Sequence, residues 1–146
     1  MDHYQLSFKL RSIIGFDEAS RPRFHSGFTV EVKFPLDYPK GKPNVYLTDK
    51  PWPIHPNIWK DGRICLEGTQ HWIPGIGVSL DALCLMIGEI IAYQEVNLYS
   101  RAYSDSLLEQ WIRSNLIFNG STKVKNPVDP AQIRLPDAED IIRWGI

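Results

Sequence analysis

A strict alternation of apolar and polar residues between Phe28 and Phe34 is the feature that most constrains how this chain can fold. The apolar members are Phe28, Val30, Val32 and Phe34. A period of two puts alternate side chains on opposite faces, which predicts a half-buried β-strand. Residues 4–14 alternate in part and residues 44–48 hold a short apolar run, so we expect two further strands there. Residues 15–27 are polar and residues 35–43 are rich in proline, which indicates turns within an antiparallel meander.

Helical spacing replaces this alternation after a long interval without a regular pattern. Residues 49–79 are rich in Pro, Gly, Trp and His, and an ordered loop of this length usually carries function. Ser79 can cap a helix that we expect to end near residues 93–96. A second helix is expected over residues 102–115, with a break at residues 119–121. A meander followed by separate helices predicts an α+β fold.

The C-terminal tail cannot form one long helix because it contains Pro127, Pro130 and Pro136. A short amphipathic piece over residues 137–144 could pack on the body or dock on a partner. We therefore divide the chain into a domain of residues 1–118 and an extension of residues 119–146, which we expect to pack on the same domain.

Length and composition point to one ordinary globular domain. The chain has 146 residues, of which 43% are apolar and 23% charged, with a formal net charge of −1. This balance gives no reason to expect nucleic acid or a membrane surface as a partner. No apolar run is long enough to cross a membrane and the first residues do not resemble a secretory signal, so we expect a cytoplasmic protein with reduced cysteines.

The candidate site lies in the segment from His55 to Leu66. Pro56 restricts the backbone, and the dipeptide Asp61-Gly62 is typical of a tight turn. Asn57 precedes Cys65 by eight residues across that turn, so the amide and the thiol could face one another. A thiol on a rigid backbone beside a neutral hydrogen-bond donor suits acyl transfer, in which an oxyanion must be stabilised.

Other interpretations of the cysteines have to be weighed against this one. A buried structural cysteine is the commoner fate of an isolated Cys, so the residues around Cys65 leave both alternatives open. Cys84 lies in an apolar helical stripe, and we interpret it as a core residue. Together with His55 and His71, these cysteines lack the spacing of a zinc site, so no metal is expected. The local signatures of papain-like proteases are also missing.

At these residues the chain resembles the ubiquitin-conjugating enzymes. The tripeptide His55-Pro56-Asn57 and the later Ile64-Cys65-Leu66 are similar to the active-site stretch of that family. Residues 34–39 resemble its Phe-Pro-x-x-Tyr-Pro signature, and residues 72–74 resemble its Trp-x-Pro motif. The resemblance runs from about residue 28 to residue 111. It implies a UBC-like fold, in which the meander leads through a long active-site loop to C-terminal helices.

The resemblance also implies an activity. Cys65 would accept ubiquitin or a ubiquitin-like protein as a thioester and transfer it to an amine, usually a lysine. Asn57 would stabilise the oxyanion or fix the active-site loop, whereas His55 would be mainly structural. No cofactor is implied, because ATP is used upstream by the activating enzyme. The implied partners are the modifier, the activating enzyme, a protein substrate and a ligase.

Several positions depart from the family pattern. Tyr4 already belongs to the first expected strand, so the family's N-terminal helix is expected to be missing. Ser100 stands near an Asp that orients the incoming lysine in the family, and Glu67 and Asp105 are alternative acceptor-side candidates. We interpret the chain as a divergent member, and we place it as a hypothesis in a prokaryotic ubiquitin-like conjugation system with a role in antiviral defence.

Four residues are candidates for partner binding: Trp52, Pro53, Trp72 and Pro74. In the family the corresponding loops are part of the surface read by ligases, although core or loop packing is the more common role of a tryptophan. A non-catalytic ubiquitin-binding adaptor on the same fold is the main alternative function, and a purely structural domain is a third. Retention of Cys65 and Asn57 favours the enzyme.

Overall fold

The structure, a computed structural model, describes residues 3–66, 76–98, 105–118, 123–127 and 143–145. Its elements in chain order are β1 (His3–Phe16), β2 (Pro22–Lys33), β3 (Asn44–Leu47), α1 (Leu80–Ile91), β4 (Val96–Asn97), α2 (Ser106–Asn115), β5 (Leu116–Phe118), β6 (Lys123–Pro127) and β7 (Arg143–Gly145). None of the described helices has the length and apolar character needed to span a membrane.

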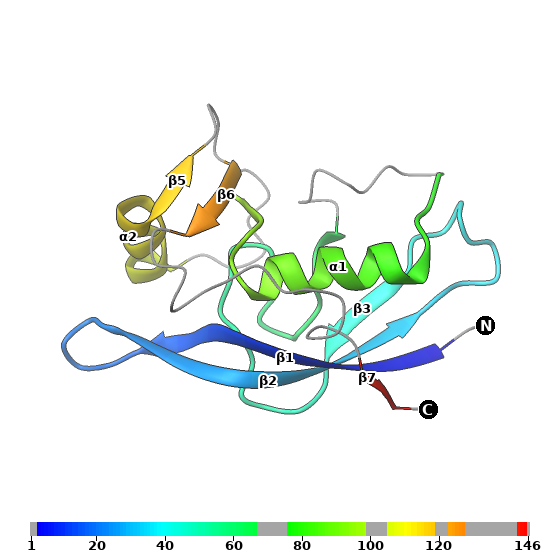
Figure 1. The fold of residues 1–146 in the computed structure, drawn as a ribbon, viewed down its shortest axis with the longest axis horizontal. Coiled ribbons are helices and arrows are strands. Elements are labelled where there is room, and N and C mark those ends of the chain that lie inside the picture. The colour runs from blue at the N-terminus through cyan, green and yellow to red at the C-terminus, as the bar shows by residue number, and fades with distance from the viewer. Residues whose placement is uncertain (1–2, 67–75, 99–104, 119–122, 128–142, 146) are drawn as a thin grey trace.

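A four-stranded antiparallel sheet, in the order β3-β2-β1-β7, forms the base of the molecule. Helix α1 lies across one face of it, and α2 lies with β5 and β6 beyond the C-terminal end of α1 (Figure 1). The second sheet has the order β4-β6-β5. This arrangement confirms the α+β fold and the antiparallel meander of β1, β2 and β3. In the described part of the chain no helix precedes β1.

The alternation in the sequence selects the buried face of the sheet. Phe28, Val30 and Val32 point into the core, and cross-strand pairing sets Phe28 opposite Phe8. Helix α1 covers this face with residues that are almost completely buried: Leu83, Cys84, Met86, Ile87, Gly88, Ile90 and Ile91. Burial raises the pKa of the Cys84 thiol to about 12, and its interpretation as a core residue is confirmed.

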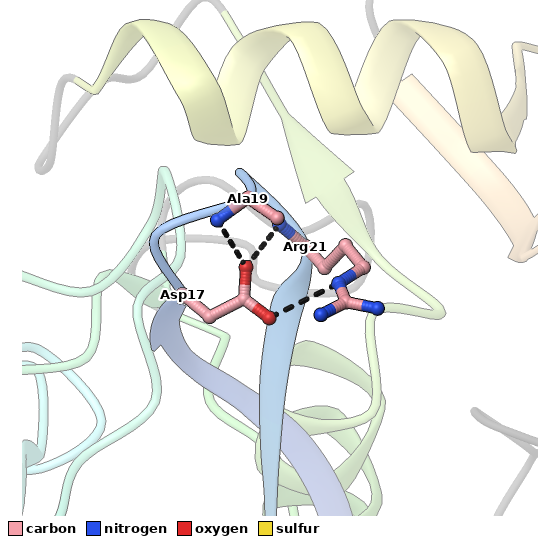
Figure 2. Close-up of polar contacts among 3 residues, drawn as sticks. All are labelled: Asp17, Ala19 and Arg21. Atoms are coloured by element: carbon pink, nitrogen blue, oxygen red, sulfur yellow. Dashed lines mark hydrogen bonds and ion pairs between the residues drawn. The ribbon is translucent and has the colours of Figure 1, made fainter.

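The first turn is much shorter than the expected region of residues 15–27, and that prediction is wrong in extent. One carboxylate closes it: Asp17 Oδ1 accepts the backbone N–H groups of Ala19 and Arg21, both at 2.9 Å, and Oδ2 accepts Arg21 Nε at 3.2 Å (Figure 2). These bonds, led by the backbone N–H of Arg21, lower the pKa of Asp17. Pro22 then begins β2, and the first residue of a strand is a place where proline is tolerated.

Both helices differ from the expected bounds. Helix α1 ends at Ile91, before residues 93–96, because Tyr93 adopts a left-handed backbone with φ of 60°. Helix α2 begins at Ser106, and the expected residues 102–104 lie outside the described residues. It ends at Asn115, as expected, and β5 follows directly.

Two parts of the C-terminal extension pair with the sheets of the preceding domain. Strand β6 pairs with β4 and β5, and β7 pairs with β1 in a register that sets Trp144 opposite Leu6. Most of the expected amphipathic piece, residues 137–142, lies outside the described residues. The sequence pattern suggested amphipathic packing there, whereas residues 143–145 use backbone hydrogen bonding to an existing strand.

Candidate active site

A hydrogen-bonded reversal presents Cys65. The N–H of Trp59 donates to the carbonyl of Arg63 at 2.8 Å, and the N–H of Cys65 donates to the carbonyl of Asn57 at 2.8 Å. Gly62 closes the turn with φ of +93°, and a Cβ there would lie 3.2 Å from both the Leu47 carbonyl and the Trp52 ring. A larger residue would therefore be strained and crowded at this position. The tight turn expected from the sequence is confirmed.

The reversal continues the edge of the main sheet. The N–H of Ile64 donates to the carbonyl of Val45 at 2.8 Å, and the N–H of Leu47 donates to the carbonyl of Gly62 at 2.8 Å. Ile64 and Leu66, which flank Cys65, are 6% and 5% exposed, whereas Cys65 itself is half-buried. The thiol residue is thus held between two core anchors on rigid backbone while it keeps access to the surface.

His55 is completely buried and both ring nitrogens have partners. The backbone N–H of Asn57 donates to Nδ1 at 2.9 Å, so Nε2 carries the proton and donates to the Glu95 carbonyl at 3.0 Å. Burial lowers the pKa of His55 to about 3. The imidazole is therefore neutral at physiological pH and is used to hold the turn, with its ring packed 4.7 Å from the ring of Tyr93.

The side chain of Asn57 joins this turn to β4. Its Nδ2 donates to the carbonyl of Asn97 at 2.9 Å, and its Oδ1 accepts the N–H of Asn97 at 2.8 Å. The residue is only 1% exposed, so water does not compete for these bonds. Because its backbone carbonyl also accepts the N–H of Cys65, Asn57 links the thiol residue to β4.

The segment that follows α1 supplies hydrogen-bond and packing partners for the turn around His55, and the sequence analysis missed them. The Tyr93 hydroxyl donates to the carbonyl of Ile54, directly before His55, and the Tyr93 ring makes an edge contact with Trp111 at 5.8 Å. Glu95 and Asn97 contribute backbone groups to the site. Backbone partners leave no signature in residue type, so no pattern in the sequence marked them.

The remaining predicted site residues have other roles or lie outside the described residues. Asp105 caps α2, because its Oδ1 accepts the N–H of Leu108 at 2.9 Å. Trp52 lies over Gly62 and donates from Nε1 to the Thr48 carbonyl at 3.3 Å, and Pro53 is buried, which favours the packing alternative for this pair. The residues outside the described ranges are Glu67, Trp72, Pro74 and Ser100.

The imidazole of His55 is not available as a base for the Cys65 thiol. His55 is buried and fully hydrogen-bonded, so it cannot take a proton from Cys65 in the manner of a protease. Within the described ranges no three His, Cys, Asp or Glu side chains gather where they could hold a metal ion. A rigidly placed thiol of this kind suits exchange between thioesters, in which the substrate is already activated.

Comparison with known proteins identifies the family. A sequence profile described as ubiquitin-conjugating enzyme matches residues 19–118. The chain is 36% identical over 61 residues to Probable ubiquitin-conjugating enzyme E2 W-A of Danio rerio, a match of 41% of this chain and 39% of that protein. It is 33% identical over 70 residues to Probable ubiquitin-conjugating enzyme E2 17 of Arabidopsis thaliana, covering 47% and 42%. The chain belongs to the ubiquitin-conjugating enzyme family, and it spans about two fifths of the length of these relatives.

The buried imidazole predicts a specific acid sensitivity. The pKa of His55 is about 3 in the folded protein and about 6.5 in an unfolded chain, so the unfolded state binds the extra proton first. This contribution to stability is fully present above pH 6.5 and is lost as the pH falls towards 3. Between pH 6.5 and pH 4.5 we expect the free energy of unfolding to fall by up to about 1.4 kcal/mol per pH unit.

Urea unfolding of the wild type and of His55→Gln, measured at several pH values, tests this expectation. The variant should be less stable at pH 7, because two buried hydrogen bonds change, but its stability should fall less steeply over the same pH range. If the free energy of unfolding fell equally steeply with pH in both proteins, the acid sensitivity could not be attributed to His55.

Proposed function

We propose that this protein is a conjugating enzyme that accepts ubiquitin or a ubiquitin-like protein as a thioester on Cys65 and transfers it to an amine. The observation that carries the proposal is the placement of Cys65, half-buried at the end of a reversal whose backbone is bonded to Asn57 and to β3. Membership of the ubiquitin-conjugating enzyme family supports it.

Charging of Cys65 would be an exchange of thioesters. The Cys65 thiolate attacks the carbonyl carbon of the modifier's C-terminal thioester on the activating enzyme. A new C–S bond forms, the old C–S bond breaks, and the departing thiolate takes up a proton. The exchange is balanced without an oxidant, a metal or an organic cofactor, because ATP has been consumed upstream when the carboxylate was activated.

Transfer would follow when a neutral amine attacks the same carbonyl carbon. The C–N bond forms, negative charge collects on the carbonyl oxygen, and the Cys65 thiolate leaves as the intermediate collapses. The proton of the attacking nitrogen passes to solvent. The thioester already supplies the driving force, so the protein has mainly to hold the carbonyl in place for the amine.

A hollow at one end of α1 supports a ligase-binding surface there. It has a volume of about 390 Å³ and its wall includes Tyr38, Val78 and Leu36, the last 90% exposed. The Tyr38 hydroxyl accepts the N–H of Val78 at 2.6 Å. This bond joins the connection of residues 35–43 to the segment that follows the Trp-x-Pro motif. In that segment Ile76 is 69% exposed. We infer that ligases bind here.

A charge placed on this surface should affect ligase action selectively. We expect Leu36→Glu and Ile76→Glu each to abolish most of the acceleration that a ligase gives to discharge of the charged protein, while charging of Cys65 is unchanged. Leu107→Glu, at a leucine 38% exposed on α2, is the matched control. Loss of charging in the two surface variants, or full ligase response, would contradict the assignment.

The thioester itself is tested by incubating the protein with ATP, a cognate activating enzyme and its modifier, followed by a non-reducing gel. We expect a shifted band that thiol removes, absent in Cys65→Ala and present in Cys84→Ala. In Cys65→Ser the band should resist thiol, since it would be an oxygen ester. If a proven cognate pair gives no adduct, the enzyme is excluded and the ubiquitin-binding adaptor takes its place.

The two roles considered for Asn57 predict different results for Asn57→Ala. The two bonds to Asn97 support loop fixing, so we expect charging and discharge to fall together. We also expect the free energy of unfolding to fall by about 1–3 kcal/mol, because the two hydrogen bonds between the Asn57 side chain and the Asn97 backbone are lost. Gel assays of each step, with urea unfolding, measure these quantities. A fall in discharge alone, with stability retained, would instead assign Asn57 to oxyanion stabilisation.

A further inference from the structure

The C-terminal cap of α1 has a tyrosine at a position that glycine normally takes. The N–H of Gln94 donates to the carbonyl of Glu89 at 2.8 Å, and the N–H of Tyr93 donates to the carbonyl of Ile90 at 3.1 Å. This pair of bonds is a common helix cap, and its left-handed position falls on Tyr93, with φ of 60°. A Cβ makes that backbone conformation unfavourable, so glycine would serve helix capping better. Such conformations persist where the surrounding structure enforces them, and they often mark functional sites.

The side chain of Tyr93 gives a reason for a tyrosine at this position. It is completely buried, its hydroxyl donates to the carbonyl of Ile54, and its ring centre lies 4.7 Å from that of His55. The N–H of Ile54 donates to the carbonyl of Ile13 in β1 at 2.8 Å. The residue before His55 is therefore fixed to the main sheet on one side and to Tyr93 on the other.

Trp111 of α2 supports the Tyr93 ring from another side. The two ring centres lie 5.8 Å apart and the ring planes meet at 80°, an edge-to-face arrangement that aromatic pairs favour. Leu108 and Ile112 of the same helix are buried, which anchors α2 to the core. Three rings therefore follow one another from α2 to the active-site turn, in the order Trp111, Tyr93 and His55.

We propose that Tyr93 is a positioning residue for the reaction at Cys65 and that Trp111 holds it in place. The ring of Tyr93 packs on His55, whose Nδ1 accepts the N–H of Asn57 at 2.9 Å. The carbonyl of Asn57 accepts the N–H of Cys65 at 2.8 Å. Because Tyr93 is buried, it acts on the thiol through these contacts. The proposal rests on the proposed function and assigns a further residue to the same site.

Tyr93→Phe isolates the positioning role, because it keeps the ring and removes only the hydroxyl bond to Ile54. In discharge of the isolated thioester to free lysine, we expect the maximum rate to fall about fivefold, since a small displacement of reacting groups slows the reaction. Charging should fall by a similar factor. The lysine concentration that gives half the maximum rate should not change, because the buried Tyr93 side chain is not accessible to the amine.

Tyr46→Phe is the matched control. It also removes a tyrosine hydroxyl bond, to Glu31, on the face of the main sheet turned away from α1. Both rates should stay at the wild-type values in this variant. Urea unfolding of the two variants and the wild type checks that each is folded under the assay conditions, so that a lower rate cannot come from an unfolded fraction.

A spectroscopic comparison of the same variants tests the proposal without the modifier. In the uncharged protein, the backbone N–H resonances of Asn57 and Cys65 report the two hydrogen bonds that place the thiol. Both resonances should shift in Tyr93→Phe, in which the aromatic ring is retained, so that the shift reports a change in the hydrogen bonds. Neither resonance should shift in Tyr46→Phe.

The support from α2 is tested by Trp111→Leu. We expect this variant to discharge about twofold more slowly than the wild type, since it loosens the Tyr93 ring without removing it. In a protein that already carries Tyr93→Leu, the same substitution should cause no further slowing, because Trp111 acts through the ring of Tyr93. Equal effects of Trp111→Leu in both backgrounds would show that Trp111 does not act through Tyr93.

Three results would overturn the role of Tyr93. They are a wild-type maximum rate in Tyr93→Phe, an equal fall in Tyr46→Phe, or a Tyr93→Gly variant as stable and as active as the wild type, which would leave Tyr93 with helix capping alone. Failure of the wild type to form any thioester would be a failure of the proposed function instead, and the N–H resonances would still test whether Tyr93 places the turn.

Discussion

The paired hydrogen bonds between the Asn57 side chain and the backbone of Asn97 are the constraint on which the site depends. One oxygen accepts an N–H at 2.8 Å and one nitrogen donates to a carbonyl at 2.9 Å. Since the carbonyl of Asn57 also holds the N–H of Cys65, a single residue sets the thiol loop against β4. The Asn57 amide carries a donor nitrogen and an acceptor oxygen on separate atoms, and an ionised aspartate, which has no donor, cannot replace both bonds.

His55 also makes two hydrogen bonds with one side chain. Its neutral ring accepts one hydrogen bond and donates another, and burial holds its pKa too low for acid–base work. Tyr93 packs on that ring and bonds to the carbonyl of Ile54, so the turn is held from both sides by the segment that follows α1. A histidine in the same segment as a reactive cysteine would ordinarily be considered a general base. Here its ring N–H is bound to the Glu95 carbonyl and its other nitrogen accepts the N–H of Asn57, so His55 does not serve as a base for Cys65.

What could be predicted from the sequence depends on how local each interaction is. The alternation at Phe28–Phe34 and the spacing from Asn57 to Cys65 are local, and they gave the buried sheet face and the reversal. The hydrogen bonds from the Asn57 side chain to Asn97 span forty residues and use the backbone atoms of Asn97. The residue type at position 97 therefore does not predict them. The first turn was placed too broadly because one Asp17 carboxylate closes it, an effect invisible to composition. The left-handed backbone of Tyr93 is likewise set by tertiary contacts.

The two faces of the reversal therefore differ in how far their side chains can be substituted. On its inner face, Asn57 and His55 are committed to bonds that fix the thiol, so a change there disturbs the whole site. On its outer face, Trp59 and Arg63 are joined across the reversal by a backbone hydrogen bond that does not depend on their side chains. Their side chains can vary while Cys65 stays in place. A substitution of Trp59 or Arg63 should therefore leave the backbone around Cys65 in place, whereas a substitution of Asn57 or His55 removes side-chain hydrogen bonds that hold it.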